Sequence, residues 1–150
     1  MGNVQEKLKS RPVVVIVGGG VGGTEVARLL ESQFNVLLID KKDHFFHKYA
    51  PLRAAVDSSF ATNIAIPYSK LLKYGHVLQA EVTEVQENGF KIKGNDDLFH
   101  FDYLVLATGS TYSFPSKNVL HDHKLLPELF AESEKVIKEV FFWFILIIFF

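Results

Sequence analysis

The sequence predicts an α/β fold with a parallel central sheet, and its first third carries the observations that support this. Residues 13–17 are an unbroken apolar run, mostly valine, as expected of a strand buried on both faces of a sheet. A glycine-rich turn at 18–23 ends the run, and residues 24–33 then show the apolar spacing of a helix that packs on a sheet. Residues 35–39 form a second apolar run, which ends at Asp40. The order strand, tight turn, helix, strand predicts a βαβ unit.

The next stretch of the chain predicts irregular structure. Residues 41–59 indicate a loop containing a short helix near 52–56, with Pro51 suited to its first turn. Residues 67–74 indicate another short helix.

The second half predicts a small antiparallel β-meander and one more buried strand. Residues 77–85 and 90–92 favour strands joined by a hairpin turn at Asn88-Gly89, and residues 98–101 extend the meander. Residues 103–106 are a short apolar strand that ends at a run of small residues, 107–110.

The sequence divides the chain into three segments. We expect a polar leader at 1–12, one folded domain at 13–139 that ends in an amphipathic helix over 125–139, and an apolar tail at 140–150. As a helix, the eleven-residue tail would reach about 16 Å, too short for the roughly 30 Å of a bilayer core. It also lacks the charged face of an interfacial helix, which counts against association with a membrane surface, although that alternative stays open.

Composition excludes several classes of function. The 48% apolar content is typical of a globular chain, and the net charge of −1 provides no basic stripe for nucleic acid. Because the 150 residues include no cysteine, disulfide frameworks, thiolate zinc sites and redox dithiols are excluded. Residues 4–11 are too polar for a secretory signal, and we expect a cytoplasmic protein. Gly2 raises the question of N-myristoylation, which Glu6 argues against without deciding it.

The glycine-rich turn carries the strongest chemical signal, a G-x-G-x-x-G between strand and helix. Gly18 would permit the tight turn, Gly20 would let a pyrophosphate approach the backbone, and Gly23 would let helix and strand pack closely. The helix that follows would direct free N–H groups at the phosphates. Asp40 follows Gly18 by about 20 residues, the spacing of an acid that binds a ribose. These features predict a Rossmann-like dinucleotide site.

The chain resembles the pyridine nucleotide–disulfide oxidoreductase superfamily, in which such a turn and acid bind the ADP half of FAD and a later Ala-Thr-Gly turn closes on the same cofactor. Ala107-Thr108-Gly109 matches that second turn. Residues 43–47, 52–56 and 60–61 are similar to the apoptosis-inducing-factor-2-like flavoproteins, also called ferroptosis suppressor proteins.

The resemblance implies a set of cofactor-binding residues. Glycines and Asp40 would contact the FAD pyrophosphate and ribose, Arg53 the cofactor phosphates, and the backbone near Glu81 and Val82 the adenine. The predicted FAD-binding residues are Gly18, Gly19, Gly20, Val21, Gly22, Gly23, Asp40, Arg53, Glu81, Val82, Thr108 and Gly109. No metal site is expected, because His44 and His47 lack a carboxylate partner at a convincing spacing.

The resemblance also implies an activity. Members without redox cysteines pass electrons from NAD(P)H through the flavin to a quinone-type acceptor. No second G-x-G-x-x-G for NAD(P)H follows residue 139, so we expect a truncated form of such an enzyme, incomplete for turnover. Two alternatives stay open: a non-catalytic nucleotide-binding fragment, and a protein that associates with membranes through its tail. The sequence does not predict the oligomeric state.

Overall fold

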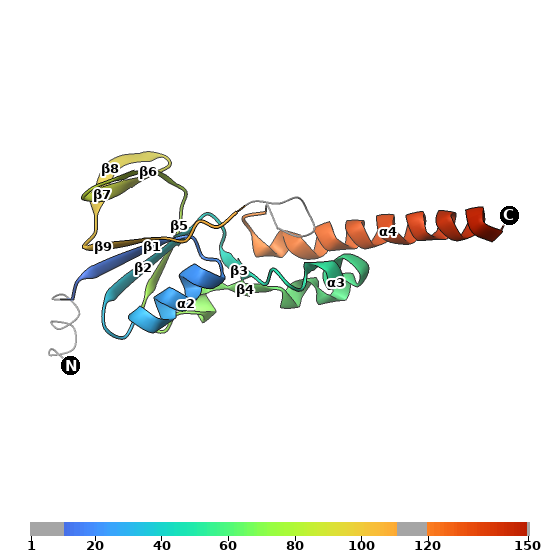
Figure 1. Cartoon of the computed structure of the whole chain (residues 1–150), viewed down its shortest axis with the longest axis horizontal. Helices are drawn as coiled ribbons and strands as arrows, with labels where there is room; N and C mark the ends of the chain where they lie inside the picture. The colour runs from blue at the N-terminus through green and yellow to red at the C-terminus, as the bar shows by residue number, and fades with distance from the viewer. Residues whose placement is uncertain (1–10, 111–119, 150) are drawn as a thin grey trace. The chain divides into compact units, whose positions relative to one another are not determined.

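The computed structural model describes residues 11–110 and 120–149. Its described residues form two compact units, 11–45 with 67–110 and 46–66 with 120–149 (Figure 1).

A four-stranded parallel sheet organises the first unit. Its strands are β1 (Val13–Val17), β2 (Asn35–Asp40), β5 (His76–Gln79) and β9 (Tyr103–Leu106). They lie in the order β5-β2-β1-β9, and each neighbouring pair is parallel. The predicted α/β fold with a parallel central sheet is confirmed.

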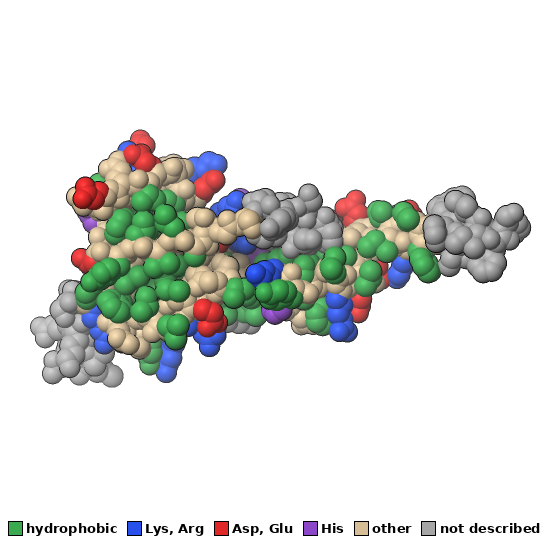
Figure 2. All heavy atoms as spheres, viewed as in Figure 1, with side chains coloured by type: hydrophobic (Ala, Val, Ile, Leu, Met, Phe, Trp, Pro, Cys, Tyr) green, Lys and Arg blue, Asp and Glu red, His purple; other side chains and the backbone are tan. Residues whose placement is uncertain are grey.

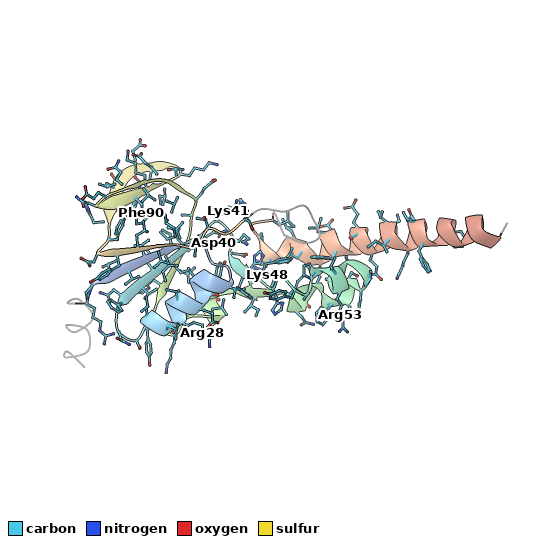
Figure 3. The ribbon with its side chains drawn as sticks, in the orientation of Figure 1. Arg28, Asp40, Lys41, Lys48, Arg53 and Phe90 are labelled. Carbon is cyan, nitrogen blue, oxygen red and sulfur yellow. The ribbon has the colours of Figure 1, made fainter. Side chains whose placement is uncertain are left out.

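Both faces of this sheet are covered, which explains the unbroken apolar run of β1. Val14 and Ile16 pack toward α2 (Val21–Leu30), while Val15 and Val17 pack toward Phe90 in an antiparallel meander (Figures 1 and 3). The meander consists of β6 (Val82–Gln86), β7 (Gly89–Ile92) and β8 (Asn95–His100), as predicted in outline.

Several predicted boundaries in the first unit were wrong. The helix begins at Val21, because the last half of the glycine turn already has helical geometry. The single strand expected over 77–85 is two strands, since the Ala80 N–H still bonds to Asp40 in the parallel sheet whereas Val82 pairs with Ile92 of the meander.

The hairpin turn also lies one residue earlier than predicted. Gln86 pairs with Gly89, so the turn residues are 87 and 88. Gly89 needs no unusual backbone angle, but a Cβ there would lie 2.7 Å from the Leu98 side chain.

The helix expected over 67–74 is reduced to one 3-10 turn, η2 (Tyr68–Lys70). The backbone N–H groups of Lys73, Tyr74 and Gly75 instead donate to the Glu31 carboxylate, at 2.8, 2.8 and 2.9 Å. A side chain at the end of α2 thus replaces the helical carbonyls as acceptor for these groups.

Two short strands, β3 (His44–Phe46) and β4 (Ala65–Pro67), pair with each other. The sequence indicated a loop at the position of β3 and predicted no strand at the position of β4. His44 is fully buried, and its Nδ1 lies 2.6 Å from the Asp43 carboxylate. His44 and His47 therefore do not share a helix face.

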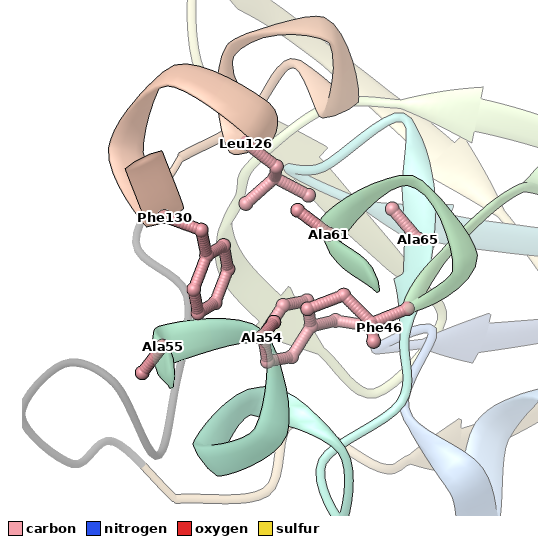
Figure 4. Packing of buried hydrophobic residues seen from close by; sticks show 8 residues of the cluster. Phe46, Ala54, Ala55, Ala61, Ala65, Leu126 and Phe130 are labelled. Atoms are coloured by element: carbon pink, nitrogen blue, oxygen red, sulfur yellow. The ribbon is translucent and has the colours of Figure 1, made fainter. Parts of the chain in front are cut away.

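The second unit is helical. It contains α3 (Pro51–Val56), η1 (Ser58–Asn63), η3 (His123–Leu125) and α4 (Leu126–Phe149), and Pro51 lies in the first turn of α3 as predicted. Leu126 and Phe130 of α4 pack on the small side chains of Ala54 and Ala61 (Figure 4). The Glu134 carboxylate accepts a hydrogen bond from the Ser58 N–H at 2.9 Å.

Helix α4 continues beyond the predicted end at residue 139 and includes residues 140–149 of the apolar segment. Val136, Val140, Phe141 and Phe142 are more than half exposed along its described surface (Figure 2). Among the described residues, none of the helices has the length and apolar composition needed to cross a bilayer.

Candidate functional site

The candidate site lies at the carboxyl ends of the parallel strands. β1 has β2 on one side and β9 on the other, so the chain leaves β1 in one direction and later returns on the opposite side. Open parallel sheets bind ligands outside such a reversal of strand order. Gly18 follows β1, Asp40 ends β2 and Ala107 follows β9, so the topology brings these three positions to one edge.

Gly18 forms the tight turn in the way the sequence predicted. Its φ is +106°, a conformation that L side chains rarely adopt, and a Cβ would lie 2.3 Å from the Ala107 carbonyl oxygen. Its N–H donates to the Ile39 carbonyl at 2.7 Å. The turn is therefore fixed against both neighbouring strands.

Gly23 lets α2 approach β1 closely, again as predicted. A Cβ on Gly23 would lie 1.8 Å from the Gly18 carbonyl oxygen and 3.4 Å from the Ile16 side chain. Gly18 and Gly23 are thus needed by the fold itself.

Gly20 and Gly22 serve a different purpose, since a Cβ on either would meet no atom from the rest of the described chain within 4 Å. Gly20 is the N-cap of α2 and supplies no side-chain cap, and the first turn contains no acidic residue. The first helical hydrogen bond runs from the Thr24 N–H to the Gly20 carbonyl, so the N–H groups of residues 21–23 have no acceptor within the helix. This end of α2, beginning at the exposed Val21, suits an anion such as a phosphate.

Asp40 lies beside the glycine turn, as its spacing predicted (Figure 3). Its carboxylate accepts the Gly19 N–H at 2.6 Å and the Lys42 N–H at 2.8 Å. The side chain is only partly buried, and an ionised carboxylate has about four lone-pair sites. It can therefore also accept hydrogen bonds from ligand hydroxyl groups.

Tyr68 is a member of this site that the sequence did not reveal. Its hydroxyl is buried and donates to the Gly19 carbonyl at 2.8 Å. A Cβ on Gly19 would lie 2.1 Å from that hydroxyl oxygen, so Tyr68 explains why glycine stands at this position of the motif. Burial, and then the Asp40 carboxylate, raises the pKa of Tyr68 above its usual range, so the hydroxyl stays protonated.

The turn after β9 lies beside the glycine turn. The Thr108 Cα would lie 3.0 Å from a Cβ on Gly18, and Gly109 has a φ of +67°. Both residues are exposed at the same edge as the glycine turn.

The remaining predicted residues, Glu81, Val82 and Arg53, belong to other elements of the chain. Glu81 and Val82 connect β5 to β6, and the Glu81 carboxylate pairs with Lys93 at 3.1 Å. Arg53 belongs to the second unit, on α3, where its guanidinium lies 4.5 Å from the centre of the Phe60 ring (Figure 3). Its role toward a cofactor stays a prediction.

Comparison with known proteins identifies the family. A family model described as pyridine nucleotide-disulphide oxidoreductase matches residues 12–136. The chain belongs to this family. Apoptosis-inducing factor homolog B of Dictyostelium discoideum is 44% identical over 104 residues, which cover 69% of this chain and 27% of that protein. Human ferroptosis suppressor protein 1 is 41% identical over 107 residues, covering 69% of this chain and 28% of that protein.

The fold of this pyridine nucleotide-disulphide oxidoreductase chain is shared with solved structures. The sulfide:quinone oxidoreductase of Aquifex aeolicus superposes with a TM-score of 0.65 at 22% identity, covering 87% of this chain and 32% of that one. The chain thus spans about a quarter to a third of the length of the relatives it matches. The predicted resemblance to this family and to the ferroptosis suppressor proteins is confirmed.

Proposed function

We propose that this chain is the FAD-binding portion of a flavoprotein NAD(P)H oxidoreductase. The observation that carries the proposal is the uncapped N-terminus of α2, which has open space at Gly20 and Gly22 and lies next to the Asp40 carboxylate. A dinucleotide matches both parts of this site. Its pyrophosphate can accept hydrogen bonds from the N–H groups of α2, and its ribose hydroxyls can donate to the Asp40 carboxylate.

Each part of the site would have a separate task in holding the cofactor. The N–H groups of residues 21–23 would bind the pyrophosphate, and Asp40 would accept hydrogen bonds from the adenosine ribose. The backbone near Glu81 and Val82 would contact the adenine, and Thr108 and Gly109 would close on the cofactor. The family resemblance assigns Arg53 to the cofactor phosphates, and a guanidinium suits phosphate geometry. The flavin, when bound, supplies the electron-transfer chemistry, so the chain itself needs no nucleophile–base pair.

The electron donor and acceptor belong to the same proposal. NADH or NADPH as donor is supported by the family to which the chain belongs. A quinone-type acceptor is supported by the resemblance to ferroptosis suppressor proteins and by the name of the superposed sulfide:quinone oxidoreductase. We propose these substrates for a longer protein of which this sequence represents the FAD-contacting part.

The visible spectrum of the purified chain tests FAD binding. The chain is mixed with excess FAD and passed through a desalting column. Flavin absorption that elutes with the protein in about equimolar amount supports the proposal. A folded protein that elutes without flavin would contradict it and favour the alternative of a non-catalytic fragment.

A cytoplasmic location at a membrane surface is a second proposal, favoured by the exposed apolar side chains of α4 at Val136, Val140, Phe141 and Phe142. A cluster of exposed apolar side chains commonly marks an interaction surface. Flotation with liposomes of neutral phospholipid, using the full chain and a chain lacking residues 140–150, tests this. Flotation of the full chain alone supports it, whereas equal behaviour of the two chains contradicts it.

A further inference from the structure

The backbone of Gly19 is held from both sides by side chains of other elements. Its N–H donates to the Asp40 carboxylate at 2.6 Å, and its carbonyl accepts from the Tyr68 hydroxyl at 2.8 Å. Asp40 ends β2 and Tyr68 begins η2, so the two contacts come from different parts of the first unit. The Gly19 carbonyl is therefore fixed in one direction, toward a buried hydroxyl.

The direction of this carbonyl determines the direction of the next N–H group. In a planar trans peptide, the carbonyl of one residue and the N–H of the following residue point in opposite directions. Because the Gly19 carbonyl points to Tyr68 in the interior, the Gly20 N–H points the other way. Gly20 is exposed, and no distant atom of residues 11–110 or 120–149 would lie within 4 Å of a Cβ on it.

We propose that Tyr68 is a positioning residue that holds the Gly19–Gly20 peptide with the Gly20 N–H directed at the dinucleotide pyrophosphate. This inference rests on the proposed FAD site and adds a residue to it. If the peptide rotated by half a turn, it would present the Gly19 carbonyl oxygen to the phosphates, and two acceptors would then face each other.

The surroundings of Tyr68 make it a rigid support. Its side chain is 2% exposed and packs in the core cluster that contains Ile16, Ala27 and Leu38. Its own N–H donates to the Asp43 carbonyl at 3.2 Å. The hydroxyl is thus held in place by contacts within the protein, and these contacts set the orientation of the peptide.

Tyr68→Phe tests the proposal, because it removes the hydroxyl and keeps the buried ring. Tyr103→Phe, at a side chain that is 57% exposed, is the matched control. The full chain is titrated with FAD, ADP and adenosine. Loss of one hydrogen bond to the turn should weaken FAD and ADP roughly tenfold in Tyr68→Phe. Adenosine, which has no phosphate, should bind as before, and Tyr103→Phe should match the parent chain with all three probes.

Two binding results would overturn the proposal. One is unchanged affinity of Tyr68→Phe for FAD and ADP. The other is an equal loss of affinity for ADP and adenosine, which would indicate a general structural defect.

A second measurement on the ligand-free chain separates this proposal from the proposed function. Selective ¹⁵N labelling of the ten glycines gives a simple amide spectrum. Tyr68→Phe should shift or broaden the Gly19 and Gly20 resonances and leave Gly89 and Gly94 in place. If the parent chain binds none of the probes but these shifts occur, the FAD site fails while the positioning of the peptide by Tyr68 stands. If the two resonances do not change, the role of Tyr68 is refuted whatever the chain binds.

Discussion

Adding one methyl group at Gly20 or at Gly23 should have opposite consequences, although the two residues lie in the same turn. A Cβ on Gly23 would lie 1.8 Å from the Gly18 carbonyl oxygen, against the 3.4 Å at which ordinary van der Waals contact begins. To relieve this contact, α2 must move away from β1 by more than an ångström. That movement would open the core around Ala27 and Ile16, both fully buried. Overpacking of this kind costs about 3 kcal/mol or more of unfolding free energy.

Gly20→Ala meets no such obstacle. Gly20 has a φ of −75°, which alanine adopts readily, and in the part of the chain that the structure describes the added Cβ meets no distant atom within 4 Å. The loss in stability should be limited to about 0.5–1 kcal/mol, because alanine is a poor N-cap. The Cβ would, however, occupy the space through which a pyrophosphate approaches the helix. Hydrogen bonds to a charged group contribute about 1.5–3 kcal/mol, so FAD affinity should fall roughly 10–100-fold.

Urea denaturation followed by circular dichroism, together with titration of FAD fluorescence, measures both effects. The expected result is a Gly20→Ala chain that is nearly as stable as the parent and binds FAD poorly, and a Gly23→Ala chain that is strongly destabilised. The reasoning is refuted if Gly20→Ala binds FAD as tightly as the parent, or if Gly23→Ala has the stability of the parent.

Three further predictions follow from the polar contacts. Asp40→Asn should weaken FAD binding about tenfold, because the amide accepts hydrogen bonds less well than the carboxylate, and an unchanged dissociation constant would count against the ribose contact. Partial burial opposes ionisation of Glu31, but the N–H groups of Tyr74, Gly75 and Lys73 together lower its pKa below 4.5. The contribution of the Glu31 carboxylate to stability is therefore complete above pH 4.5 and is lost as the pH falls through the lowered pKa. Glu31→Gln should reduce the unfolding free energy at pH 7 by about 1 kcal/mol or less, and parent and variant should differ less in acid. A difference between the two chains that grows on acidification would contradict this. Lys138, and then Ser58, lowers the pKa of Glu134 to about 2, so Lys138→Met should raise the titration midpoint of that carboxyl in an NMR pH series, and an unmoved midpoint would show that the ion pair does not form in solution.

The local part of the fold could be predicted from the sequence because each signal lies within a few residues. The structure agrees with the predicted positions of the β1 strand, the glycine turn after it and Asp40 at the end of β2. The predicted structural tasks of Gly18 and Gly23 agree with the contacts that a Cβ would make. Residue propensity and spacing suffice to predict a structural feature when the residues that form it are close together in the sequence.

Features that depend on distant partners could not be predicted. The strand expected over 77–85 has apolar residues suited to either sheet, and only the pairing of Ala80 with β2 and of Val82 with β7 shows where the chain changes sheets. Gly89 is a residue type common in turns, but glycine is needed at this position because a Cβ would collide with the Leu98 side chain of another strand.

Tyr68 is the clearest case, since 49 residues separate it from Gly19. A tyrosine after a proline carries no local mark of contact with a glycine turn. The glycine at position 19 was the one hint, because the G-x-G-x-x-G pattern itself leaves that position free.

The central claim is that the N-terminus of α2 and Asp40 hold a dinucleotide. Titration of the 150-residue, ¹⁵N-glycine-labelled chain with FAD tests it most directly. The account predicts saturable shifts of the Gly20 and Gly22 amide resonances, with Gly89 and Gly94 of the meander unchanged. Saturation of the chain with FAD without movement of the Gly20 and Gly22 resonances would contradict it.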